Sequence, residues 1–241
     1  MCDYRQQQEV EEEERFFYLY NNDERYDTMK FKDSGADFEE PPVGTHIARC
    51  VKVIDLGTRE SEYKGATHHK HECLIGWELP FTKMSEGDFE GQPFTVTKFY
   101  TASLNEKANL RKDLMNWRGR DFTEQELEGF ESGNILGKCC MLSLTMNDKK
   151  KVKVTSVIAL PKGTQVPPQI NPSVLFSLEP DEFDQSVFDA LSDGIRGMIE
   201  KTPEYQQIKN PQKFSADSGA PFGPNSGNTE GFNDFDDDIP F

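Results

Sequence analysis

The hydrophobic periodicity of this chain changes twice, and the order of the changes limits the folds open to it. Five stretches are rich in β-branched and aromatic residues and predict strands. They cover residues 46–56, 69–79, 94–103, 135–145 and 152–160. Between the third and the fourth, residues 105–117 place apolar side chains near helical spacing. We therefore expect three strands, a helical insert and two further strands.

Local signals place the ends of these elements. Asn105 is a candidate N-cap for the first helix, and Gly119 is expected to end it. Thr123 and Glu126 have the spacing of a capping box and predict a second, shorter helix over residues 123–130. Residues 57–65 carry turn signals and are expected to form a loop. Pro80 is expected to end the second strand.

This element order is that of an OB-fold, a five-stranded barrel with its helix between strands three and four. Other small barrels and α+β sheets share the order. We assign the barrel to residues 43–162 and predict a mainly β protein.

Charge separates this middle region from its flanks. Residues 1–42 have a net charge of −8, residues 43–162 of +2 and residues 163–241 of −10. The overall charge of −16 argues against a nucleic-acid binder, but the middle region remains able to bind a polyanion locally. Residues 1–42 are expected to be largely disordered, since an acid-rich segment with one aromatic run, at 16–20, buries little.

Three segments follow the predicted barrel. Residues 163–209 hold a Pro-rich connection and amphipathic helical spacing over 181–201, which we expect to pack on the barrel. Residues 210–233 are rich in Asn, Pro, Gly and Ser and are expected to be a flexible linker.

The last eight residues combine a carboxylate run with an apolar end. They are Asp234, Phe235, Asp236, Asp237, Asp238, Ile239, Pro240 and Phe241. Such a tip suits a partner pocket that takes the Phe241 ring and is rimmed by Lys and Arg. It resembles the C-terminal tip of bacterial single-stranded-DNA-binding proteins, and that resemblance implies recruitment of host replication and repair enzymes.

A second resemblance covers the central half of the chain. The segments that carry it are Gly-Trp-Glu-Leu-Pro at 76–80, Leu-Asn-Glu-Lys-Ala-Asn-Leu-Arg at 104–111 and Trp-Arg-Gly-Arg-Asp-Phe-Thr at 117–123, together with residues 161–163 and 167–172. They are similar to a family of phage-encoded single-stranded-DNA-binding proteins. The resemblance implies an OB-fold, strand protection during phage replication and recombination, and a place in the cytoplasm of the bacterial host.

Single-strand binding needs cations for phosphates and ring faces for bases. The candidates lie on strands one to three and on the two loops that flank an OB-fold's binding face. We expect Arg49 and Lys52 to point to opposite faces, so that at most one lines the groove. The candidates are Arg49, Lys52, Arg59, Tyr63, Lys64, Lys70, Lys98, Tyr100, Lys149, Lys150, Lys151 and Lys153. For each candidate, a role as a solvated surface charge or a packed aromatic side chain is about as common as a contact with DNA.

Other chemistries have little support. His69, His71 and Cys73 alternate along one strand, and no second cluster completes a tetrahedral metal set, so we expect no metal. The chain lacks a P-loop, a Gly-x-Ser-x-Gly motif and a His-Glu-x-x-His motif, and we expect neither enzyme activity nor a cofactor. No run approaches 18 apolar residues, so no membrane partner is expected. The five cysteines, an odd number, indicate reduced thiols.

The sequence therefore predicts a non-catalytic protein that coats single-stranded DNA and engages host proteins through its tip. The tip is also expected to compete with DNA for the basic groove. An alternative is an adaptor or decoy that engages host factors through the tip without strong DNA binding of its own. Whether the chain forms a homo-oligomer is left open.

Overall fold

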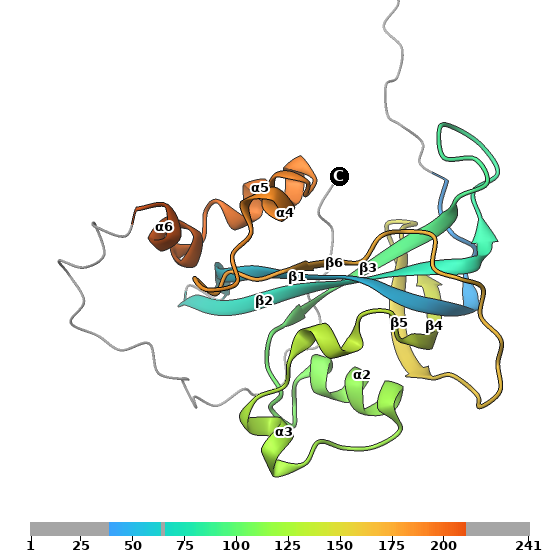
Figure 1. Ribbon diagram of the computed structural model, residues 1–241, viewed down its shortest axis with the longest axis horizontal. Helices are drawn as coiled ribbons and strands as arrows, with labels where there is room; N and C mark the ends of the chain where they lie inside the picture. Colours follow the sequence, from blue (N-terminus) through green and yellow to red (C-terminus); the bar gives the residue numbers. More distant parts are fainter. Residues whose placement is uncertain (1–38, 64–65, 211–241) are drawn as a thin grey trace, which may run out of the picture. The chain divides into compact units, whose positions relative to one another are not determined.

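The computed structural model describes residues 39–63 and 66–210, with residues 61–63 and 66 described by their backbone (Figure 1). Most of the acidic N-terminal segment, Lys64, nearly all of the linker and the whole tip lie outside the described residues. Our predictions for them therefore stay predictions.

One six-stranded sheet dominates the described residues. Its strands are β1 Gly44–Tyr63, β2 Ala66–Lys83, β3 Pro93–Thr101, β4 Cys139–Met146, β5 Val152–Ala159 and β6 Val174–Phe176. The hydrogen-bonded order is β3-β2-β1-β4-β5, with antiparallel neighbours, and β6 pairs with β1 in parallel. The prediction of a mainly β protein is confirmed. The sheet is open, because no ladder among the described strands joins β3 to β5.

The first two strands are longer than predicted. The prediction of a loop over residues 57–65 is wrong for residues 57–63, which belong to β1. The turn signal at Gly57 marks a bulge in β1, where the register shifts between Asp55 and Gly57. Gly57 has φ +71°, and a Cβ there would lie 2.8 Å from the Thr202 Oγ1 atom, so the position needs glycine. Pro80 does not end β2. It lies between Leu79 and Lys83, where the pairing of β2 with β3 is interrupted, so its missing backbone N–H costs no hydrogen bond to β3.

One face of the sheet packs on the helical insert, and we call it the lower face after its place in Figure 1. The insert comprises α2 Asn109–Arg118, α3 Glu124–Glu128 and the 3-10 helix η1 Ser132–Ile135. Trp117 of α2 lies 6.2 Å from the buried Trp77 of β2, between ring centroids. The Trp117 indole N–H donates to the Cys139 carbonyl at 2.9 Å, which ties the insert to β4.

The predicted ends of the insert are partly right. Gly119 ends α2 in the left-handed conformation, and the Thr123–Glu126 capping box is present. The N-cap prediction is wrong, because α2 begins after Ala108. The Asn105 side chain instead accepts the Lys107 backbone N–H and closes a turn before the helix.

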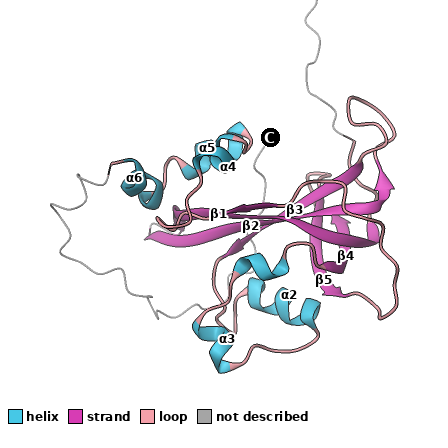
Figure 2. Ribbon diagram, viewed as in Figure 1, coloured by secondary structure: helices cyan, strands magenta, loops and turns pink. Residues whose placement is uncertain are grey.

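A layer of short helices lies over the upper face (Figure 2), and a second core forms beneath it. Residues 174–209 contribute β6 and the short helices α4 Gln185–Asp189, α5 Asp193–Ile199 and α6 Pro203–Lys209. Ile54 of β1 and Leu74 of β2 are 1% exposed and pack against this layer, while their chain neighbours Val53 and Ile75 face the lower core. The prediction that C-terminal helices pack on the sheet is confirmed.

Helix α6 lies beyond the stretch for which we predicted helices. Its start is fixed by the Thr202 side chain, which accepts the Tyr205 backbone N–H, and by Pro203 in the first turn. Along the described part of the chain, no helix combines the length and the apolarity needed to cross a membrane.

Candidate nucleic-acid interface

Arg49 and Glu78 form a buried ion pair on the upper face, between β1 and β2. Glu78 is 0% exposed, and its carboxylate lies 3.3 Å from the Arg49 guanidinium. The same carboxylate accepts the backbone N–H of Ile170 at 3.2 Å and that of Asn171 at 2.9 Å. Arg49 also donates to the Pro167 carbonyl at 2.6 Å. Arg49 is therefore a structural residue that anchors residues 167–171, which we call the strap.

The strap and the helices after it cover much of the face on which DNA binding was predicted. The strap contacts Glu78, β6 pairs alongside β1, and α4 to α6 cover Ile54, Leu56 and Leu74. In this structure most of the upper surface of β1 and β2 is thus occupied by the protein's own chain.

Lys98 and Tyr100 do not reach this upper face. Tyr100 is 4% exposed in the lower core, and its hydroxyl donates to the Asp113 carboxylate at 2.8 Å. Lys98 lies 2.9 Å from the same carboxylate. Burial, followed by the Asp113 charge, raises the pKa of Tyr100. The prediction that they share a face is confirmed, but the buried ring is not available to a base.

Lys52 lies on the same face as Arg49, so the prediction that the two point to opposite faces is wrong. A bulge between Cys50 and Lys52 inserts one residue into β1. Beyond it the side chains alternate in the opposite sense, which brings Lys52 to the face that Arg49 occupies. Lys52 pairs with Gly76, and its Cβ atom is 3.1 Å from the position that a Gly76 Cβ would take. Its stem therefore lies against Gly76, in space that a larger side chain there would occupy.

Arg59 and Lys70 lie opposite each other on the far end of the β1–β2 hairpin. Arg59 donates to Glu72 at 2.8 Å, and about a third of its side chain is exposed. Tyr63 is the last residue of β1. The predicted loop residues of this set are thus strand residues, except for Lys64, which lies outside the described range.

A polar cluster beside this hairpin fastens α6 to the sheet. The His71 Nε2 atom lies 2.7 Å from Asp55, and its Nδ1 atom lies 3.8 Å from Glu204 of α6. Glu204 also accepts the Thr58 hydroxyl at 2.5 Å and the Thr58 backbone N–H at 3.0 Å. The hydrogen bond to Asp55 raises the pKa of His71, against burial, and the charges of Asp55, Glu204 and Glu179 act in the same direction.

The β4–β5 turn presents the most exposed cations of the predicted set. Lys149, Lys150, Lys151 and Lys153 are all exposed. The turn is closed by Asn147, whose side chain accepts the Lys151 backbone N–H at 2.8 Å, and by Lys150 in the left-handed region at φ 62°. Lys151 also lies 3.3 Å from Glu40. These lysines therefore project from a fixed turn.

Our sequence reasoning missed apolar side chains that accompany these lysines. Phe81 is 59% exposed on β2, Met146 is 56% exposed at the end of β4, and Val43 is 54% exposed just before β1. Exposed Lys83 ends β2. The sequence held no signal for the exposure of Phe81, because this residue continues the alternation of Ile75, Trp77 and Leu79, which are buried. We call Val43, Phe81, Lys83, Met146 and Lys149–Lys153 the lysine end.

Several contacts hold the lysine end together. His46 of β1 lies 3.2 Å from Thr82, which follows Phe81, and Gly44 pairs with Leu144 of β4. Consecutive residues Glu39 and Glu40 contact Ser85 on one side and Lys151 on the other. The Phe81 ring, two aliphatic side chains and several cations thus come from four segments to one end of the sheet.

The cysteine and histidine candidates do not assemble further. Burial raises the pKa of both Cys50 and Cys73 to about 12, so neither thiol ionises readily. Cys50, Cys73, Cys139 and Cys140 are free. Within residues 39–63 and 66–210, no group of three or more His, Cys, Asp or Glu side chains is placed to hold a metal ion.

Comparison with known proteins adds no relative. No protein-family model matches the chain, and no curated protein matches it.

Proposed function

We propose that this protein binds single-stranded DNA through an OB-type barrel, as a non-catalytic coat for exposed strands. The strand order supports this proposal: β1 pairs with both β2 and β4, and the path β3-β2-β1-β4-β5 is compatible with an OB-fold. Strands β3 and β5, at the two ends of the path, approach each other. The helix α2 lies between β3 and β4 in sequence, as the fold requires.

The lysine end carries the proposal for DNA. Its lysines supply positive charge for phosphates, and Phe81 supplies an exposed ring on which a base can stack. Neither feature discriminates among bases, so we expect little sequence preference. Lys52, Arg59 and Lys70 extend cationic character along β1 and β2, whereas Arg49, Lys98 and Tyr100 are left out because they serve the core.

We further propose that the tip at residues 234–241 engages host replication and repair proteins during phage replication. The support is the tip's sequence, which offers carboxylates to a basic rim and the Phe241 ring to a pocket. The proposal places the protein in the cytoplasm of a bacterial host.

The test is a titration of fluorescein-labelled oligo-dT with the full chain, followed by anisotropy at several salt concentrations. Replacing Lys150 and Lys153 by Ala should weaken binding and lower the slope of log K against log salt by about 0.7 for each lost phosphate contact. Phe81→Ala should weaken binding roughly 5- to 150-fold, since stacking on one ring is worth about 1–3 kcal/mol. Lys112→Ala, an exposed lysine of α2, is the matched control and should change nothing.

Removing residues 234–241 should tighten DNA binding, because the acidic tip competes with DNA for the lysines. Binding that is insensitive to salt, or unchanged by the lysine and Phe81 variants, would contradict the proposed site. If the full chain and the tip-deleted chain both fail to bind oligo-dT, the adaptor function is favoured.

A further inference from the structure

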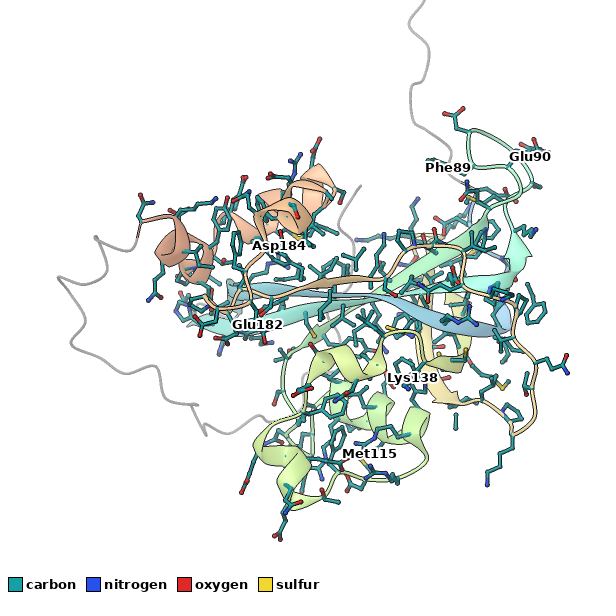
Figure 3. All side chains as sticks on the ribbon, in the orientation of Figure 1. Phe89, Glu90, Met115, Lys138, Glu182 and Asp184 are labelled. Carbon is teal, nitrogen blue, oxygen red and sulfur yellow. The ribbon has the colours of Figure 1, made fainter. Side chains whose placement is uncertain are left out.

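An acidic loop with an exposed phenylalanine lies beside the lysine end. The β2–β3 loop carries Glu86, Asp88, Phe89 and Glu90, all exposed, with Phe89 at 55%. Figure 3 shows Phe89 and Glu90 at the outer end of this loop, away from the sheet. We call residues 86–90 the acidic loop. DNA binding does not account for it, because its carboxylates repel phosphate.

The loop has a defined conformation. The Gly91 backbone N–H donates to the Met84 carbonyl and the Met84 N–H to the Gln92 carbonyl, both at 2.9 Å, and the Gln92 N–H donates to the Phe89 carbonyl at 3.0 Å. The Glu39 carboxylate accepts both the backbone N–H and the hydroxyl of Ser85 at the base of the loop. Phe89 is therefore held in an outward position by the loop that carries it.

The acidic loop and the lysine end lie at one end of the sheet. Glu39 contacts the base of the loop, while the adjacent residue Glu40 contacts Lys151 and the Val152 backbone N–H. The charges at this end are of both signs, with Asp148 the one acid within the lysine turn. One end of the molecule thus presents a negative element and a positive element on either side of residues 39–40.

Exposed apolar side chains concentrate at the same end. Of the eight large apolar residues that are exposed in the described part of the chain, four belong here: Val43, Phe81, Phe89 and Met146. An exposed apolar group rimmed by charge is typical of a protein interaction surface. Because both signs of charge are present, the surface is complementary to a copy of itself.

We propose that two copies of this protein associate end to end about a twofold axis through this surface. A twofold contact places the acidic loop of each copy against the lysine turn of the other and brings the exposed apolar side chains together. The contact uses the lysines that the proposed function assigns to DNA. A DNA strand therefore displaces the second copy, and the dimer is a storage form of the free protein.

Sedimentation velocity of the full chain without DNA tests the contact directly. We expect a dimer at 0.1 M salt that dissociates at 1 M, where the screening length falls from about 10 Å to about 3 Å. A loop variant replaces Glu86, Asp88 and Glu90 by Lys, and a turn variant replaces Lys149, Lys150 and Lys153 by Glu. Each variant alone should dimerise at least about tenfold more weakly, since like charges then face each other.

Mixing the two variants is the decisive experiment. The loop variant has a predominantly positive end and the turn variant a predominantly negative end, so a 1:1 mixture should form a heterodimer at 0.1 M salt. The control variant replaces Glu124, Glu128 and Glu131 by Lys, three exposed carboxylates on or beside α3, and should dimerise like the wild type. Unfolding curves establish that each variant is folded.

A wild-type chain that stays monomeric at 0.1 M salt would overturn the proposal, as would a dimer that the mixed variants fail to restore. Addition of oligo-dT to the wild type should convert the dimer to a DNA-bound monomer. A dimer that persists unchanged while DNA binds would overturn the competition. Failure of DNA binding alone would leave the dimer measured in its absence intact, so the two proposals fail separately.

Discussion

Glu78→Gln is the substitution that most directly probes how the strap is held. It removes a charge from a side chain that is 0% exposed, opposite an Arg49 side chain that is 11% exposed. The amide keeps one oxygen acceptor but loses the second. At least one of the groups now bonded to the carboxylate is then left unsatisfied: these groups are the Arg49 guanidinium, the Ile170 and Asn171 backbone N–H groups and the Asn171 side-chain amide.

The expected cost follows from these partners. Removing one member of a buried ion pair costs about 3–5 kcal/mol. Because Gln retains an acceptor for part of the network, we expect a loss of roughly 2–4 kcal/mol in the free energy of unfolding. With a urea slope of about 2 kcal/mol per molar, the midpoint should fall by about 1–2 M. The buried Trp77 and Trp117 report the transition by fluorescence.

Glu72→Gln is the matched control, since it makes the same change on the same strand. Glu72 pairs with Arg59, but both side chains are partly exposed, at 25% and 34%, so the loss should stay below about 1 kcal/mol. Hydrogen exchange gives a local readout: the Ile170 and Asn171 amides should exchange faster in the Glu78 variant only. Equal midpoints for the two variants, or unchanged exchange at Ile170 and Asn171, would refute this account of the strap.

Two further predictions concern the clusters on either face of the sheet. The pKa of His71 is raised from 6.5, so its contribution to stability is complete below pH 6.5 and is lost as the pH rises through the folded-state pKa. The urea midpoint should therefore fall above pH 6.5 more steeply in the wild type than in His71→Gln, and parallel curves would contradict the role of His71. Asp113→Ala leaves the Lys98 ammonium and the Tyr100 hydroxyl without their shared acceptor. The free energy of unfolding, measured in urea, should fall by roughly 2–3 kcal/mol, while the affinity for oligo-dT should stay unchanged. A loss of affinity without a loss of stability would show instead that Lys98 and Tyr100 take part in DNA binding.

Much of the fold could be predicted because local signals and periodicity agree in the middle of the chain. The five main strands, the helical insert and the capping box at Thr123 and Glu126 all follow from residue pattern. The bulge at Cys50–Lys52 could not be predicted, since one inserted residue leaves no mark on composition yet exchanges the faces of the side chains that follow, up to the second bulge at Asp55–Gly57.

The candidate site was harder to predict than the fold. Lys98 and Tyr100 carry the residue types that DNA needs, but only the structure places Asp113 where it satisfies both. Arg49 is not available to DNA because it pairs with Glu78, 29 residues away in the sequence. Residue patterns do not predict a contact at that separation. The turn lysines were found because a run of cations beside a tight turn is almost always exposed.

Strands β1 and β2 contribute side chains to both cores, one on each face of the sheet. This limits where the chain can be truncated without exposing one of the cores. A fragment ending at residue 162 would keep the lower core but uncover Ile54, Leu56 and Leu74, which are at most 1% exposed in the structure. Such a fragment would present a broad apolar surface to solvent and be prone to aggregate. A fragment that keeps both cores covered must therefore extend at least to Ile208 of α6, which packs against the upper core.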